Sequence, residues 1–181
     1  MKNVSRLTLV ALATGSLALA LTSCGGSSDK AAGGTSDASA LVNTTTAAPQ
    51  ASGAFGSVVT LPDGTAFTLT KQAVFVPTKF SSGQVDGERF NSFDITVTNG
   101  TKDPLDLGIL ILTTTASDGQ GCVDIFDDQN GLHGAPSDPV APGGTLTFGW
   151  AVSCPGNVGD ALNVTMTTDG TTNVEVKGKL V

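Results

Sequence analysis

Apolar and polar residues alternate along most of the second half of the chain, and this two-residue period constrains the fold more than any other feature. Phe93, Ile95 and Val97 alternate with polar neighbours, as in a strand with one buried face. The same period recurs over 146–154 and 162–166, whereas helical periodicity is hard to find. The folded part is therefore expected to consist of β-strands.

Turn residues separate the predicted strands at short intervals. In Pro62-Asp63-Gly64 the proline presets φ and the glycine accepts positive φ. The predicted strands are 56–61, 65–76, 93–98, 105–112, 122–126, 146–154, 162–166 and 174–180. About seven or eight short strands predict an all-β, antiparallel β-sandwich. The stretch 105–112 is apolar on both parities, so it is either covered on both faces or passes between sheets.

The N-terminus carries the marks of an exported lipoprotein. A basic head precedes an apolar run over 7–21, which is shorter than the roughly 20 residues of a membrane-spanning helix. Leu21-Thr22-Ser23-Cys24 resembles the lipobox of bacterial lipoproteins. That resemblance implies cleavage before Cys24 and acyl chains such as palmitate on a lipidated Cys24. The protein would then be anchored at the extracytoplasmic face of the cell membrane. An ordinary secretion signal with an incidental cysteine is the alternative.

Composition divides the chain into three predicted segments. Residues 1–23 form the cleaved signal peptide, and residues 24–55 form a linker rich in Gly, Ser, Ala and Thr. The linker has few large apolar residues to offset its ordering entropy, so it is expected to be disordered. Residues 56–181 are long enough for one domain with its own core.

The mature chain is acidic. Loss of Lys2 and Arg6 leaves seven basic residues against sixteen acidic ones, a formal net charge of −9. Nucleic-acid binding requires basic patches, so no nucleic-acid partner is expected. Membrane attachment is expected through the lipid on Cys24, and an envelope protein or ligand is a possible partner. Neither a specific partner nor an oligomeric state follows from the sequence.

Two further cysteines form an even pair in a disulfide-permissive compartment. A Cys122–Cys154 bridge would close a loop of roughly 33 residues and stabilise the fold by about 3–4 kcal/mol. The alternative is two separate buried thiols.

Several motifs together resemble those of a known domain family. The strand Phe93–Gly100 is followed by Asp103-Pro104, Ser117–Gln120 forms an Asp-Gly turn, and 141–145 leads into Phe148–Val152. In order and spacing they are similar to an immunoglobulin-like domain of unknown function, found at the C-terminus of many bacterial lipoproteins and secreted antigens. The resemblance implies an immunoglobulin-like sandwich in an extracytoplasmic setting, with no shared catalytic site.

The sequence contains few residues that could form a catalytic site. His133 is the only histidine and lies in a loop rich in Gly and Pro, without a Gly-x-Ser-x-Gly elbow elsewhere. A copper site would need a second histidine, and Asn157 stands where a ligand would follow Cys154. No acid lies in an apolar context that would raise its pKa for glycoside cleavage. We expect no enzyme and no cofactor.

Asp124, Asp127 and Asp128 form a weak calcium candidate. Hard cations take six to eight oxygen ligands, but an EF-hand frame would place Phe126 at the first ligand position. A solvated turn is the simpler interpretation.

The remaining hypothesis is a non-enzymatic binding module. The alternative is a structural or antigenic spacer without a specific ligand, and an enzyme is the third possibility. Phe75, Phe80 and Phe90 flank the polar loop 79–88 and belong either to the core or to an exposed recognition patch. A pocket or apolar patch among the loops 79–88 and 127–142 would favour binding, and a uniformly polar surface would favour the spacer.

Overall fold

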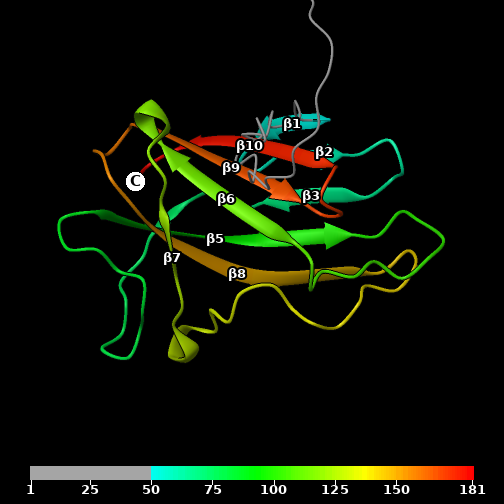
Figure 1. The fold of residues 1–181 in the computed structure, drawn as a ribbon, viewed down its shortest axis with the longest axis horizontal. Coiled ribbons are helices and arrows are strands. Elements are labelled where there is room, and N and C mark those ends of the chain that lie inside the picture. Colours follow the sequence, from blue (N-terminus) through cyan, green and yellow to red (C-terminus); the bar gives the residue numbers. More distant parts are fainter. Residues whose placement is uncertain (1–49) are drawn as a thin grey trace, which may run out of the picture. The chain divides into compact units, whose positions relative to one another are not determined.

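The computed structural model describes residues 50–181, which form a sandwich of two β-sheets (Figure 1). The first sheet has the order β1-β10-β9-β6, with the bounds Ala51–Ala54 (β1), Asn173–Lys179 (β10), Ala161–Thr167 (β9) and Ile111–Ala116 (β6). The second has the order β2-β3-β5-β8-β7, with the bounds Val58–Thr60 (β2), Ala66–Leu69 (β3), Arg89–Thr98 (β5), Thr145–Cys154 (β8) and Val123–Ile125 (β7). A short strand β4 (Ala73–Val74) pairs with β5 beyond the end of β3.

This architecture confirms the predicted all-β sandwich. The only helical elements in residues 50–181 are two short 3₁₀ turns, η1 (Ser117–Gly119) and η2 (Asp128–Asn130). Within the same residues, no helix is long and apolar enough to cross a membrane. The predicted signal peptide, Cys24 and most of the linker lie outside the described residues.

The pairing of β5 with β8 shows why the alternating pattern produces this core. Arg89 lies opposite Cys154 at one end of the antiparallel ladder and Thr98 opposite Thr145 at the other. In this register, Phe93 faces the same side as Trp150, and both side chains are buried. Burial of each such side chain contributes about 1.5–3 kcal/mol. The predicted core roles of Phe93 and Trp150 are therefore confirmed.

The sheet begins earlier than the sequence indicated. β1, whose residues were assigned to the disordered linker, pairs in parallel with β10, so the sandwich is not wholly antiparallel. The Phe55 ring also packs edge-on against Phe93, with 5.2 Å between ring centroids. β1 was missed because its sequence Ala-Ser-Gly-Ala has no large apolar residue, and it is placed by backbone pairing with β10 and by the packing of Ala51 against the core.

The ambiguous apolar stretch 105–112 passes from one sheet to the other. Leu105 pairs with Val140 in an isolated bridge, and regular pairing with β9 begins only at Ile111. Between them, Leu107 is fully buried. The second of the two interpretations of this stretch is therefore confirmed.

A small second cluster lies apart from the main core. Ile125, Leu132 and Ala151 are buried together, and Phe75 and Phe90 pack against them partly buried. Ile125 and Ala151 are cross-strand partners on the outer face of the second sheet. The loop that follows β7 therefore covers part of this face.

Candidate functional site

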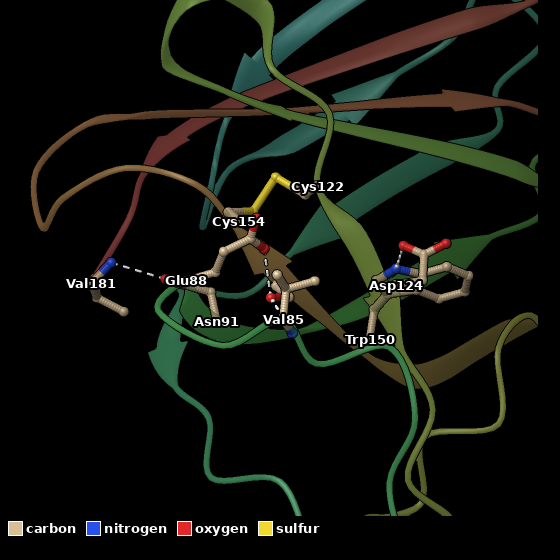
Figure 2. The surroundings of a disulfide bond; sticks show 9 residues. Val85, Glu88, Asn91, Cys122, Asp124, Trp150, Cys154 and Val181 are labelled. Atoms are coloured by element: carbon tan, nitrogen blue, oxygen red, sulfur yellow. Dashed lines mark hydrogen bonds between the residues drawn. A yellow bond between two sulfur atoms is a disulfide. The ribbon is translucent and has the colours of Figure 1, made fainter.

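The Cys122–Cys154 disulfide is present, as the sequence predicted (Figure 2). Val123 lies opposite Ser153 in the antiparallel β7–β8 pair, so the same register places Cys122 opposite Cys154. Their Cα atoms are 4.4 Å apart, close to the spacing of directly opposed residues. The bridge therefore joins neighbouring strands of one sheet. The Cys122 N–H also donates to the Thr114 carbonyl of β6, in the other sheet.

Asp124 lies beside Trp150, and this contact corrects one expectation from the sequence. Its Oδ1 accepts a hydrogen bond of 2.9 Å from the Trp150 indole Nε1 (Figure 2). Burial raises the pKa of Asp124, and the indole hydrogen bond only partly opposes that rise. An acid with a raised pKa is therefore present, contrary to the sequence analysis. Its partner is a structural indole.

Asp127 joins the loop after β7 to the chain after β4. Its carboxylate accepts hydrogen bonds from the Thr78 N–H at 2.7 Å, the Thr78 hydroxyl at 2.8 Å and the Asn130 Nδ2 at 3.0 Å. Burial acts to raise the pKa of Asp127, but these hydrogen bonds together with one from the Gln129 backbone hold it below its ordinary value. Asp127 thus has a structural role.

The third acid of the calcium candidate points elsewhere. Asp128 is exposed and contacts His133, with 2.9 Å between Oδ1 and Nδ1. The three carboxylates therefore serve three different partners. In residues 50–181, no three His, Cys, Asp or Glu side chains converge in a way that could hold a metal ion.

Three contacts anchor the predicted loop 79–88. Ser82 pairs with Phe126 beside β7, and the Val85 N–H donates to the Ser153 hydroxyl at 3.1 Å. That hydroxyl in turn donates to Glu88 at 2.7 Å. Phe80 lies outside these contacts with 68% of its surface exposed, so it does not belong to the core.

A pocket of about 380 Å³ opens on the outer face of the second sheet. On this face, Thr96 and Thr98 of β5 each share a hydrogen bond with the threonine opposite on β8, at 2.8 and 3.1 Å. One step along the ladder, Asp94 lies opposite Gly149. Gly149 has no side chain to cover Asp94, and the surface is hollow at this pair.

Residues from two separate segments wall this pocket. Phe75 comes from the chain after β4, and Leu132 from the loop after β7. Leu132 packs over Gly149, where an added Cβ would meet the Leu132 Cδ2 at 3.0 Å. Ser92 contributes polar lining.

The backbone is irregular where the pocket meets β3. The predicted strand 65–76 is divided into two short strands. At the break, the Asp94 N–H donates to the Thr70 hydroxyl at 2.7 Å and not to a backbone carbonyl of the neighbouring strand. In the part of the chain that the structure describes, no hydrogen bond or ion pair reaches the Asp94 carboxylate. Local spacing does not reveal Asp94 and Gly149 as a pair, because their pairing depends on the register between two distant strands.

A second hollow of about 240 Å³ shares Phe75 with this pocket. It is lined by Val74, Phe75, Glu88, Arg89, Phe90, Val158 and Val181. Phe75 and Phe90 therefore lie between core and surface, and Phe75 contributes to both hollows.

No protein-family model and no curated protein matches the sequence. Solved structures with a similar fold include a candidate lipoprotein from Bacillus subtilis, ycdA, with 12% identity and a TM-score of 0.53. The match covers 74% of this chain but 39% of ycdA, so the chain spans about two fifths of that protein's length.

Two further structures show lower similarity. An uncharacterised β-sandwich protein from Clostridium difficile has 12% identity and a TM-score of 0.42, covering 72% of this chain and 96% of that one. A FixG-related protein from Vibrio parahaemolyticus has 13% identity and a TM-score of 0.41, covering 65% and 94%. At such low identity, the likeness to ycdA shows a shared β-sandwich fold alone.

Proposed function

We propose that the protein is a lipid-anchored, non-enzymatic binding module at the extracytoplasmic face of the membrane. The observation that carries this proposal is the pocket over Asp94 and Gly149, where an unpartnered carboxylate lies among polar side chains and the apolar Phe75 and Leu132. Concave sites with apolar walls and a few polar groups are typical of ligand binding. A structural spacer would not need a pocket. Cross-strand threonine pairs, like those on the neighbouring part of this face, would be enough to cover the sheet.

The anchor rests on the sequence. Leu21-Thr22-Ser23-Cys24 matches the lipobox pattern, and the fold shared with a candidate lipoprotein is compatible with this setting. The immunoglobulin-like resemblance at 93–104 and 141–152 supports the same location.

No catalytic step is assigned to the pocket. Its lining residues in the described part of the chain include one carboxylate and no histidine or cysteine. Ser92 and Lys71 also line the pocket, but within residues 50–181 no hydrogen bond or ion pair joins either of them to the Asp94 carboxylate, so no nucleophile is paired with a base. His133 contacts the exposed Asp128 instead.

A capture experiment tests the binding role. The full-length protein would be immobilised and exposed to envelope extract, and retained molecules would be identified by mass spectrometry. Gly149→Leu fills the pocket floor, while Thr165→Val alters the outer face of the other sheet as a matched control. Trp150 fluorescence would verify that each variant is folded.

We expect the wild type and Thr165→Val to retain the same ligand and Gly149→Leu to lose it. Retention of nothing by the wild type would favour the spacer. Equal retention by Gly149→Leu would place the binding surface elsewhere and overturn the assignment of the pocket.

A further inference from the structure

We infer that the pocket takes an organic cation, namely a primary ammonium group on a short apolar stem. This inference rests on the proposed function, because it names the ligand class of the same pocket. It depends on the position of Asp94, the polar groups around it, the apolar walls and the charge of the domain.

The Asp94 carboxylate is the negative group to which the ligand would bind. Its Oδ1 lies over the pocket floor, 3.8 Å from the position that a Cβ of Gly149 would occupy. No cation within residues 50–181 forms an ion pair with it. Asp94 is exposed at the mouth of the hollow, and a carboxylate forms its strongest hydrogen bonds with a charged donor.

Neighbouring oxygens suit the remaining donors of an ammonium group. Such a group has three N–H donors and no acceptor. The Ser92 hydroxyl lines the pocket next to Asp94 on the same face of β5. The Asn130 side chain also lines it, and its Nδ2 is used by Asp127, which leaves its carbonyl oxygen as an acceptor.

The apolar walls suit the stem that carries the ammonium. Phe75 and Leu132 line the pocket, and Phe75 is only partly buried. An aromatic ring attracts a cation within about 6 Å of its centre as well as packing against apolar carbon. The volume of about 380 Å³ lies at the small end of ligand sites, which run from roughly 300 to 1,000 Å³.

Charge disfavours an anionic ligand. Residues 50–181 contain six Lys and Arg against fourteen Asp and Glu, a formal net charge of −8. Lys71 also lines the pocket, and its stem lies alongside Gly56, where an added Cβ would be 3.7 Å from the Lys71 Cγ. A metal ion is also disfavoured, because no three ligating side chains converge within the described residues.

Three probes of similar shape and different charge test this inference on the full-length protein. They are phenethylamine, 2-phenylethanol and 3-phenylpropionate, each titrated by calorimetry and by amide chemical shifts at Asp94 and Gly149. Phenethylamine is expected to bind about two- to fivefold more tightly than the alcohol, from the typical strength of an exposed ion pair. Its affinity should fall as salt is added.

Two variants locate the charge that the ligand recognises. Asp94→Asn keeps the shape of the side chain and is expected to remove the preference for phenethylamine. Lys71→Gln removes the one positive charge among the lining residues and is expected to tighten phenethylamine binding.

The outcomes separate this inference from the proposed function. Three results would overturn the inference that the ligand is a cation, although the pocket would still bind. They are equal binding of the alcohol and the amine, tighter binding of the propionate, and an unchanged preference in Asp94→Asn. Failure of all three probes would overturn the cation inference, and the capture experiment would decide the binding role independently.

Discussion

The carboxylate of Asp127 joins two parts of the chain that are 49 residues apart. It is 1% exposed, and it is held by Thr78 and Asn130. The adjacent Asp128 has 90% of its side chain exposed and is a natural control.

Asp127→Asn is expected to lower the thermal unfolding midpoint at neutral pH, because a neutral amide replaces the charged acceptor and only one of its two terminal atoms can still accept a hydrogen bond. Asp128→Asn is expected to leave the midpoint unchanged. Calorimetry of both variants measures the difference, and equal midpoints would contradict the role of Asp127.

The effect of pH has a defined sign. Hydrogen bonds outweigh burial and lower the pKa of Asp127 from its ordinary value of 3.8, so its carboxylate stabilises the folded state above that value. This contribution is lost as pH falls through the lowered pKa. The difference in unfolding midpoint between the wild type and Asp127→Asn should therefore become smaller in strong acid.

Gly178 of β10 leaves space for side chains from elsewhere in the fold. An added Cβ would overlap the Gln72 Nε2 and would lie 2.5 Å from the Phe55 Cδ2. Gly178→Ala is expected to reduce the free energy of unfolding by about 1–3 kcal/mol through overpacking. Gly121 meets nothing within 4 Å, so Gly121→Ala is the control. Denaturant unfolding measures both, and a neutral Gly178→Ala would argue against the packing of Phe55.

At this scale, sequence patterns predicted which apolar residues are buried but not the partners of polar ones. Phe93 and Trp150 follow from alternation alone. Asp127 was a calcium candidate because it lies near Asp124 and Asp128 in sequence, yet its partner Thr78 is far away along the chain. The partners of hydrogen bonds between distant segments cannot be identified from the spacing of residues along the sequence.

Among the strands, β7 is short, and a disulfide bond directly before it joins it to β8. The disulfide fixes its start to the end of β8, while the Cys122 N–H bonds to β6 of the other sheet. The Cys122→Ala/Cys154→Ala double variant is expected to lose about 3–4 kcal/mol of unfolding free energy, from the entropy of the closed loop. Denaturant unfolding followed by Trp150 fluorescence measures this loss.

Reduction provides the matching control for the disulfide. The wild type with a reductant should unfold like the double variant, which should itself not respond to the reductant. Two titratable thiols in the unreduced, unfolded wild type would show that the bridge does not form.

The strand β1 tests where the folded domain begins. A chain starting at Gly56 lacks β1 and Phe55, and with them the ladder to β10 and the bond from the Phe55 N–H to Lys177. It should be less stable than a chain starting at Gln50 by about 2 kcal/mol or more, at about 1 kcal/mol per hydrogen bond. Equal unfolding curves would support the predicted boundary at residue 56.

Element boundaries were predictable where apolar side chains alternate and not where the backbone alone decides. β5, β8 and β9 overlap the predicted strands over most of their length. The predicted strand 65–76 divides at Thr70 because a side chain replaces the ladder there. That irregularity also shapes the pocket wall, so the features that define the site were the least visible in the sequence.

For the whole molecule, the sandwich could be predicted because its pattern is repeated in every long strand. The pocket could not, since it requires a glycine on β8 to lie opposite Asp94 on β5. A shift of one residue in that register would turn the Asp94 side chain towards the core. Fold class is thus fixed by the average pattern, and the site by one pairing within it.

Attachment to the membrane is argued from Cys24, which lies outside the described residues. Cys24→Ser removes the thiol required for the thioether, so the variant is expected to leave the membrane fraction or accumulate as an unprocessed precursor. One acyl chain gives marginal binding and two give stable anchoring, and the acidic mature chain has little attraction for anionic headgroups. Ser23→Ala keeps a small residue before the cleavage point and should remain membrane-bound. Fractionation with fatty-acid labelling measures both, and continued labelling of Cys24→Ser would refute the lipobox.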